Sequence, residues 1–260
     1  MCALFQSGVP QPPVDPIARA PFSFPKIVGA EIAATIFHHR VAGDFYDCFR
    51  VSPERILFGL LDVAGRPDTN RLILETAQKF FRTLGVELFA RPDINESDAM
   101  VQLCVQLNRG IMEKAAGVHS CPAFIGCYHE KFGTLCYTNA GHTPGLLRDS
   151  TGVVELASTG LPLGLFSHAT CEAPTVGFQK GAALLLVSRG VVEGISKDKD
   201  NNDGEDAEFG LERTEAFLRS DHSASAQSLC AAILHEAGEF VGEPLVPDDM
   251  TALALMRTGS

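Results

Sequence analysis

The 260-residue sequence lacks the features that mark membrane, secreted and nucleic-acid-binding proteins. No apolar run approaches the roughly 18 residues of a transmembrane helix, and no basic region followed by an apolar core opens the chain. We therefore expect neither a membrane span nor a signal peptide. Basic residues are also scarce: 21 Lys and Arg stand against 32 Asp and Glu, a net charge of −11. This charge argues against unspecific binding to nucleic acid or anionic membrane.

Paired cysteines and common catalytic motifs are absent as well. The eight cysteines form no CxxC pair, and most lie among apolar residues, which favours buried free thiols in a reducing cytoplasm. No GxSxG elbow accompanies a Ser/His/Asp triad. A cysteine phosphatase needs a glycine-rich Cys-x5-Arg loop. Cys104 is followed by Arg109 inside a predicted helix, and Cys121 has no nearby Arg, so we set this class aside.

The stretch 42–65, AGDFYDCFRVSPERILFGLLDVAG, is the segment around which we interpret the remainder. Two apolar, aromatic-rich arms, Phe45–Val51 and Ile56–Val63, flank a Pro-containing turn, a pattern that predicts a β-hairpin. One arm begins directly after Asp44, and the other carries Asp62 near its end. The hairpin therefore places the two carboxylates side by side at one end of a sheet.

Two adjacent carboxylates in a partly dry cleft repel each other, so positive charge is expected between them. A hard divalent cation with oxygen ligands is the usual source. The alternative is that Asp44 and Asp62 cap turns beside Gly43 and Gly65.

Residues 1–25 contain six prolines and predict an extended arm or linker, and residues 26–258 predict one domain. Hairpins with segregated amphipathic helices indicate an α+β fold, with two antiparallel sheets packed together and helices on the outer faces. The predicted strands are 27–38, 45–51, 56–63, 123–129, 134–140, 145–148, 153–156, 171–178, 182–188 and 251–256. The predicted helices are 67–88, a second one capped by Asn95 or Ser97, 211–218, and a last one capped by Ser225. Strands 171–178 and 182–188 are expected to pair across Lys180-Gly181.

Several segments together resemble the SpoIIE/RsbU-type branch of the PPM (PP2C-like) metal-dependent protein serine/threonine phosphatases. The resemblance runs from about Phe24 to Arg257. The segments are FPKIVGAEIAATIFHHRVAGDFYD, LLDVAG, AFIGCYHEKFGTLCYTNAGHTPGLL, GLPLGLF, GAALLLVSRGVVEG, FGLERTEAFL and PDDMTALALM. The resemblance implies a four-layer αββα sandwich with two Mn²⁺ or Mg²⁺ ions. Water activated by these ions would attack phosphoserine or phosphothreonine directly.

The resemblance also implies roles for individual residues. Asp44 would bind one ion, and Asp62 would bridge both, with the backbone from Val63 nearby. Asp248, together with Asp249, would hold the other ion. A turn that serves as a structural signature of the fold contains Asn139, Gly141 and His142. His142 is interpreted mainly as a hydrogen-bonded turn residue, with a direct role in the chemistry as the alternative.

Arg189 departs from the family pattern, because the family usually has a metal-binding Asp at this position. A guanidinium cannot ligate a cation and stays protonated. Two interpretations follow: a phosphatase, with activity impaired by Arg189, or a non-catalytic pseudophosphatase that binds a phosphoprotein or regulatory partner. The resemblance implies a phosphorylated protein partner, such as an anti-sigma-factor antagonist, and allows a homodimer. Since only about 25 Pro-rich residues precede the domain, we expect no sensor domain in this chain.

Overall fold

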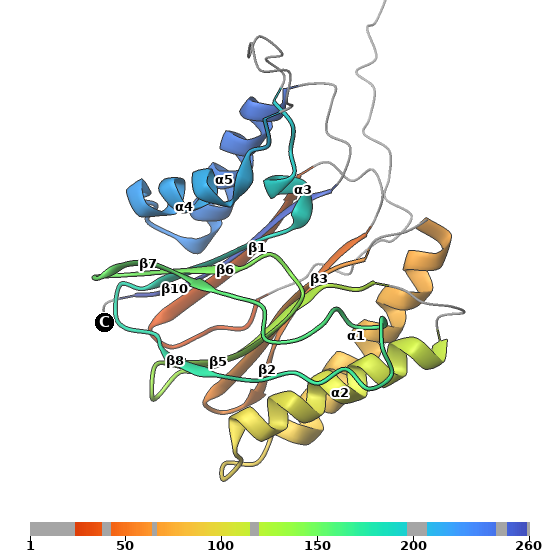
Figure 1. The fold of residues 1–260 in the computed structure, drawn as a ribbon. Coiled ribbons are helices and arrows are strands. Elements are labelled where there is room, and N and C mark those ends of the chain that lie inside the picture. The colour runs from red at the N-terminus through yellow and green to blue at the C-terminus, as the bar shows by residue number, and fades with distance from the viewer. Residues whose placement is uncertain are drawn as a thin grey trace, which may run out of the picture.

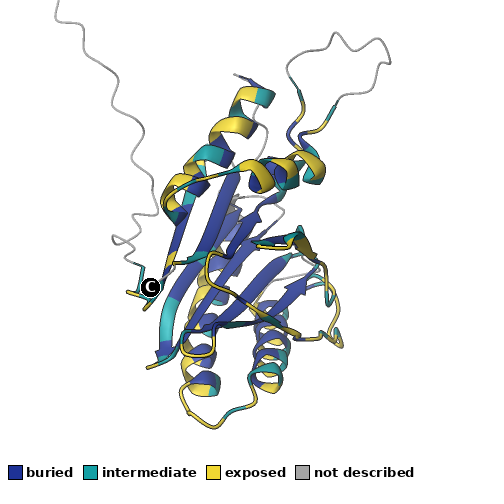
Figure 2. Ribbon diagram, turned by 90° about the vertical axis from the view of Figure 1, so that its left-hand side faces the viewer, coloured by how far each residue is buried: buried dark blue, intermediate teal, exposed yellow. Residues whose placement is uncertain are grey.

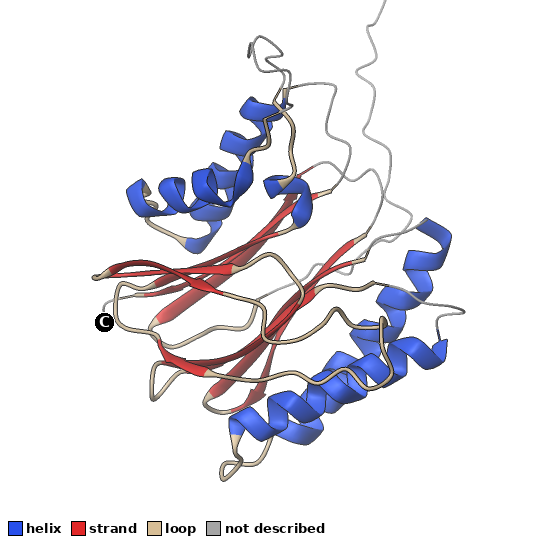
Figure 3. Cartoon of the chain, viewed as in Figure 1, coloured by secondary structure: helices blue, strands red, loops and turns tan. Residues whose placement is uncertain are grey.

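Two antiparallel five-stranded sheets pack face to face, with helices on both outer faces (Figures 1 and 3). This is the α+β, four-layer αββα arrangement expected from the sequence. The computed structural model describes residues 24–37, 43–63, 67–114, 120–196, 207–242 and 249–258. Within these ranges, no helix is long and apolar enough to cross a membrane.

The first sheet has the strand order β1-β10-β9-β6-β7. Its strands are β1 (Ala30–Phe37), β10 (Met250–Arg257), β9 (Ala183–Val187), β6 (Gly145–Asp149) and β7 (Gly152–Leu156). The covering helices are α4 (Gly210–Ser220) and α5 (Ala226–Val241), and the short helix α3 (Arg189–Val192) follows β9. The start of α5 is fixed by Ser225, the predicted cap, which forms a capping box by exchanging hydrogen bonds with Ser228.

The second sheet has the order β2-β3-β4-β5-β8. Its strands are β2 (Asp44–Ser52), β3 (Arg55–Asp62), β4 (Ala123–His129), β5 (Thr134–Ala140) and β8 (Thr175–Gly177). Its outer face is covered by α1 (Pro67–Phe89) and α2 (Glu96–Lys114). Asn95 caps α2, since its side-chain oxygen accepts hydrogen bonds from the backbone nitrogens of Ser97 and Asp98 at 3.1 and 3.3 Å.

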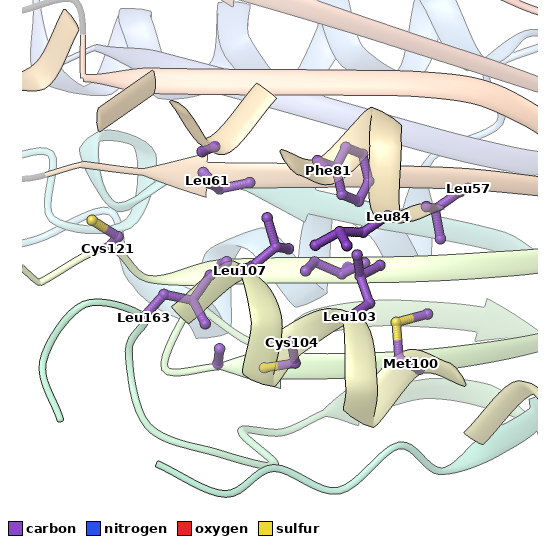
Figure 4. Packing of buried hydrophobic residues seen from close by; sticks show 14 of the residues in the cluster. Leu57, Leu61, Phe81, Leu84, Met100, Leu103, Cys104, Leu107, Cys121 and Leu163 are labelled. Atoms are coloured by element: carbon purple, nitrogen blue, oxygen red, sulfur yellow. The ribbon is translucent and has the colours of Figure 1, made fainter. Parts of the chain in front are cut away.

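Three apolar layers hold the four structural layers together. Strand β3 shows why: every residue in it is buried, and successive side chains point to opposite faces. Ile56, Phe58 and Leu60 enter the layer between the sheets, whereas Leu57 and Leu61 pack under α1 and α2 (Figure 4). A third layer joins the first sheet to α4 and α5. The sheets are consequently buried on both faces over most of their area (Figure 2).

The predicted pairing of 171–178 with 182–188 is wrong. Strand β8 pairs with β5 in the second sheet, whereas β9 lies between β10 and β6 in the first. Phe178 and Ala182 both belong to the layer between the sheets, so the connection crosses that layer instead of closing a hairpin. The first strand also begins later than predicted, at Ala30, because Gly29 adopts a turn conformation with φ of +68°.

Candidate active site

Asp44 and Asp62 lie directly opposite each other at one end of the β2–β3 hairpin. The sequence-based prediction that they lie side by side is therefore confirmed. Each residue is only 6% exposed, because the hairpin end is enclosed by neighbouring chain segments. Directly opposed cross-strand residues have side chains within reach of each other, so the two carboxylates share one small, largely dry space.

The backbone around this pair is tightly packed. Val63 N donates a hydrogen bond to Gly43 O at 2.9 Å, and Asn70 Nδ2, from α1, donates to Val63 O at 2.9 Å. A Cβ atom on Gly43 would lie 2.7 Å from Val63 O, so only glycine fits there. The start of α1 is thus attached to the same turn that carries Asp62.

Strand β10 brings a third acidic residue to the site from the other sheet. Asp249, just before β10, is 2% exposed, and its Oδ2 accepts a hydrogen bond from Gly43 N at 3.1 Å. Thr251 Oγ1 donates to Asp44 Oδ2 at 2.5 Å. The start of β2 and the start of β10 therefore meet across the two sheets. Asp248, also predicted as a ligand, lies outside the described residues.

The burial and close spacing of Asp44, Asp62 and Asp249 disfavour the ionised form of all three carboxylates at once. The pKa of Asp44 is raised to about 8, mainly by burial, then by the charge of Asp62, with a smaller effect from Asp249. Hydrogen bonds from Thr251 and Ser188 act in the opposite direction. Positive charge placed beside these oxygens would restore the ionised form of Asp44.

Arg189 brings positive charge to the Asp62 side of the site. Its Nε lies 3.7 Å from Asp62 Oδ2 and 3.7 Å from Glu193 Oε2, and the side chain remains 40% exposed. Ser188 is the N-cap residue of α3, which makes Arg189 the first residue of that helix. Arg189, which departs from the family pattern, therefore lies beside the Asp62 carboxylate, where its positive charge would repel a bound cation.

The donor chemistry of Asp44 and Asp62 suits a hard divalent cation such as Mn²⁺ or Mg²⁺. Among the residues that the structure describes, however, no three His, Cys, Asp or Glu side chains are grouped closely enough to hold an ion by themselves. Asp249 is turned toward the Gly43 amide, and Arg189 stands where the family pattern places a carboxylate. The described donors fit one ion between Asp44 and Asp62 better than two.

The Asn139–His142 turn connects β5 to β6 through a set of internal hydrogen bonds. Asn139 Oδ1 accepts from His142 N at 2.8 Å, and Gly141 adopts a φ of +71° beside Pro162. Burial lowers the pKa of His142 to about 4, and its Nδ1 lies 3.0 Å from Thr143 O. His142 is thus part of a hydrogen-bonded turn, and the role of Asn139, Gly141 and His142 as a signature of the fold stays a prediction.

Three residues at the site were not singled out from the sequence: Asn70, Ser188 and Thr251. A signal existed for Thr251, because residues two apart in a strand point to the same side, so Thr251 follows Asp249 toward the site. Asn70 also carried a signal, since it is a polar residue on the apolar stripe of its helix and is fully buried.

The two sheets, their outer helices and the acidic hairpin end define a PP2C-like phosphatase domain. The family described as Stage II sporulation protein E (SpoIIE) matches residues 52–258, and the chain belongs to this family. Asp44 precedes the matched range, whereas Asp62, Arg189 and Asp249 lie within it.

Two curated relatives and one solved structure illustrate the similarity. The chain is 24% identical to Protein IcfG of Synechocystis sp. over 91% of this chain and 39% of the relative. It is 23% identical to Phosphoserine phosphatase RsbP of Bacillus subtilis over 59% of this chain and 37% of the relative. The chain thus spans less than half the length of either. The structure of the PP2C phosphatase domain of SpoIIE from Bacillus subtilis, with a fragment of its regulatory domain, shares the fold. Its TM-score is 0.70 at 15% identity, over 89% of this chain and 62% of that chain.

Proposed function

We propose that this protein is a metal-dependent protein phosphoserine/phosphothreonine phosphatase of the SpoIIE type, with activity impaired by Arg189. The observation that carries the proposal is the direct opposition of Asp44 and Asp62, buried at the end of one hairpin. Membership of the SpoIIE family supports the same reaction class. The chemistry that this site supports is hydrolysis of a phosphate monoester.

Asp44 and Asp62 would hold a Mn²⁺ or Mg²⁺ ion, with Val63 O nearby. As the family resemblance implies, Asp248 and Asp249 would serve a second ion. When bound, such an ion lowers the pKa of water and neutralises phosphoryl oxygens. The protein's own residues would shape the site and orient the substrate phosphate. Thr251 and Asp249 tie the two sheets together around the site, and Arg189 is exposed enough to contact a substrate phosphate.

Arg189 also explains why activity should be impaired. Replacing a carboxylate by a guanidinium changes the local charge by two units. A pair of unit charges about 4 Å apart interacts by roughly 4 kcal/mol at an effective dielectric constant near 20, so cation binding should weaken substantially. We expect the protein to need a higher Mn²⁺ concentration than a relative that has Asp at this position.

The direct test is Mn²⁺-dependent hydrolysis of p-nitrophenyl phosphate and of a phosphoserine peptide. Asp44→Asn and Asp62→Asn should each abolish turnover, because each removes a charge that holds the ion. Asp93→Asn is a matched control, since the Asp93 side chain is 71% exposed and distant in sequence from the site residues. Equal turnover in Asp62→Asn and Asp93→Asn would overturn the proposed mechanism.

The 3.7 Å approach of Arg189 Nε to Asp62 Oδ2 favours a second candidate, a non-catalytic pseudophosphatase. In this case the guanidinium takes the place of a cation, and the domain binds a phosphoprotein or a regulatory partner without turnover. An inert parent protein with an Arg189→Asp variant that gains Mn²⁺-dependent activity would support this candidate. Strong Mn²⁺-dependent turnover by the unmodified protein would eliminate it.

The proposed partner is a protein carrying phosphoserine or phosphothreonine, and a phosphorylated anti-sigma-factor antagonist domain is the candidate implied by the family resemblance. The name of the relative RsbP, a phosphoserine phosphatase, supports phosphoserine. A cytoplasmic location and a homodimer are further parts of the proposal. Loss of phosphate from such a domain, followed by mass spectrometry, tests the partner, and analytical ultracentrifugation tests the homodimer.

A further inference from the structure

We infer that Thr251 is a positioning residue that holds the Asp44 carboxylate in its ion-binding orientation. This inference rests on the proposed function, in which Asp44 binds a divalent cation. Thr251 is fully buried, and its Oγ1 donates to Asp44 Oδ2 at 2.5 Å. This hydrogen bond becomes charge-assisted when Asp44 is ionised, which is the form that binds a cation.

The hydrogen bonds between Thr251 and Ser188 use the backbone atoms of Thr251, so its hydroxyl proton can be donated to Asp44. Thr251 N donates to Ser188 Oγ at 2.9 Å, and Thr251 O accepts from Ser188 N at 2.9 Å. Ser188 Oγ donates in turn to Asp249 O at 3.2 Å. Because a hydroxyl has a single proton, the Thr251 hydroxyl that bonds Asp44 points in a defined direction.

The position of Thr251 makes the contact rigid. It lies in β10, which pairs with β1 on one side and β9 on the other, and Thr251 itself faces Ile36 in the β1 pairing. Asp44 lies in β2 of the opposite sheet. The Thr251–Asp44 hydrogen bond therefore joins an inner strand of one sheet to a carboxylate on the edge strand of the other, and it restricts the motion of that carboxylate.

Hydrogen bonds from neighbouring residues to a metal-binding side chain orient that side chain, and their loss typically lowers metal affinity about 10- to 100-fold. Thr251→Val keeps the shape of the side chain and removes the hydroxyl, so we expect the Mn²⁺ dissociation constant to rise at least about tenfold. Thr251→Ser keeps the hydroxyl and should stay within about twofold of the parent. Isothermal titration with Mn²⁺ alone, on the full chain, measures both values.

Thr214→Val is the matched control. Thr214 is also fully buried, but its hydroxyl donates to Gly210 O at 2.9 Å inside α4, on the far side of the first sheet. Loss of this hydroxyl should leave Mn²⁺ affinity unchanged. If Thr251→Val does not fold, Thr251→Ala replaces it. Parent-like Mn²⁺ affinity in a folded variant without the hydroxyl overturns the inference.

A second measurement separates this inference from the proposed function. Crystal structures of the metal-free parent and of Thr251→Val show whether the Asp44 carboxylate turns away when the hydroxyl is lost. If the parent binds no Mn²⁺, the proposed function fails, and a changed Asp44 side-chain rotamer still supports the positioning role. An Asp44 carboxylate that keeps its place in the variant overturns that role, whatever the metal affinity.

Discussion

At the scale of single residues, the candidate active site is dominated by acidic side chains in a buried space. Asp44, Asp62 and Asp249 are each less than a tenth exposed, and Arg189 contributes a nearby cationic side chain. Two further residues have chemistry set by their surroundings, His142 through burial and Cys171 through a neighbouring thiol. Each leads to a prediction that can be measured without any metal.

His142 should make the protein less stable in mild acid. Its pKa is about 4 in the folded chain, against an ordinary value of 6.5. Between these pH values the unfolded chain binds a proton that the folded chain does not, so the free energy of unfolding falls as pH decreases from 6.5 toward 4. The largest slope is about 1.4 kcal/mol per pH unit.

Urea unfolding of the parent and of His142→Gln, at pH 7 and pH 4.5, measures this effect. Glutamine cannot take up the proton, so the parent should lose about 2–3 kcal/mol more than the variant over this range. Identical losses would show that His142 is not the group responsible.

Cys171 should be the most reactive of the described cysteines. A hydrogen bond from the Cys104 thiol lowers the pKa of Cys171 to about 7, and Cys171 is partly exposed. The other described cysteines are buried, and burial raises the pKa of those thiols. Iodoacetamide at pH 7.5, followed by peptide mass spectrometry, should label Cys171 before Cys127. Preferential labelling of Cys127 would contradict this expectation.

At the scale of elements, α1 is attached to the second sheet by more than apolar packing. Arg82, on α1, forms a two-pronged ion pair with Asp47 of β2, at 2.7 and 2.6 Å. Asp47 is fully buried, whereas the Arg82 side chain is 46% exposed and lies 5.0 Å above the Phe49 ring. The ion pair is one of the contacts that hold the helix against the strand that begins with Asp44.

Arg82→Ala should destabilise the protein by about 2–3 kcal/mol, because it leaves a buried carboxylate without its main partner. The loss should be smaller than for a fully buried pair, because Arg82 is partly solvated. Arg71→Ala is the control, because Arg71 pairs with Glu75 on the surface at 65% and 61% exposure and should cost less than about 0.5 kcal/mol. Similar losses in both variants, measured by chemical denaturation, would contradict the buried-pair explanation.

At the scale of the whole molecule, the site lies where the two sheets meet. The contacts of Asp249 and Thr251 with Gly43 and Asp44 join the start of β10 to the start of β2. An ion bound there would belong to the folded state only, so its binding free energy adds to the free energy of unfolding.

Mn²⁺ should therefore raise the melting temperature, and EDTA should reverse the increase. At 100 times the dissociation constant the gain is about 2.7 kcal/mol. Arg189→Asp should show a larger increase at the same Mn²⁺ concentration, because it removes a repulsive charge and adds an oxygen donor. Asp62→Asn should show little increase. A Mn²⁺-dependent shift of full size in Asp62→Asn would place the ion elsewhere.

The sequence by itself determined the fold class, most element boundaries and the pairing of Asp44 with Asp62. These depend on local rules: alternation within strands, the helical stripe, caps at Asn95 and Ser225, and the fixed register of a short hairpin. The tertiary structure alone decided that β8 and β9 lie in different sheets, that Asn70 holds Val63 O, and that Thr251 bonds Asp44. Those contacts join residues from separate elements, and their geometry depends on how the sheets and helices pack around the site, which no local pattern encodes.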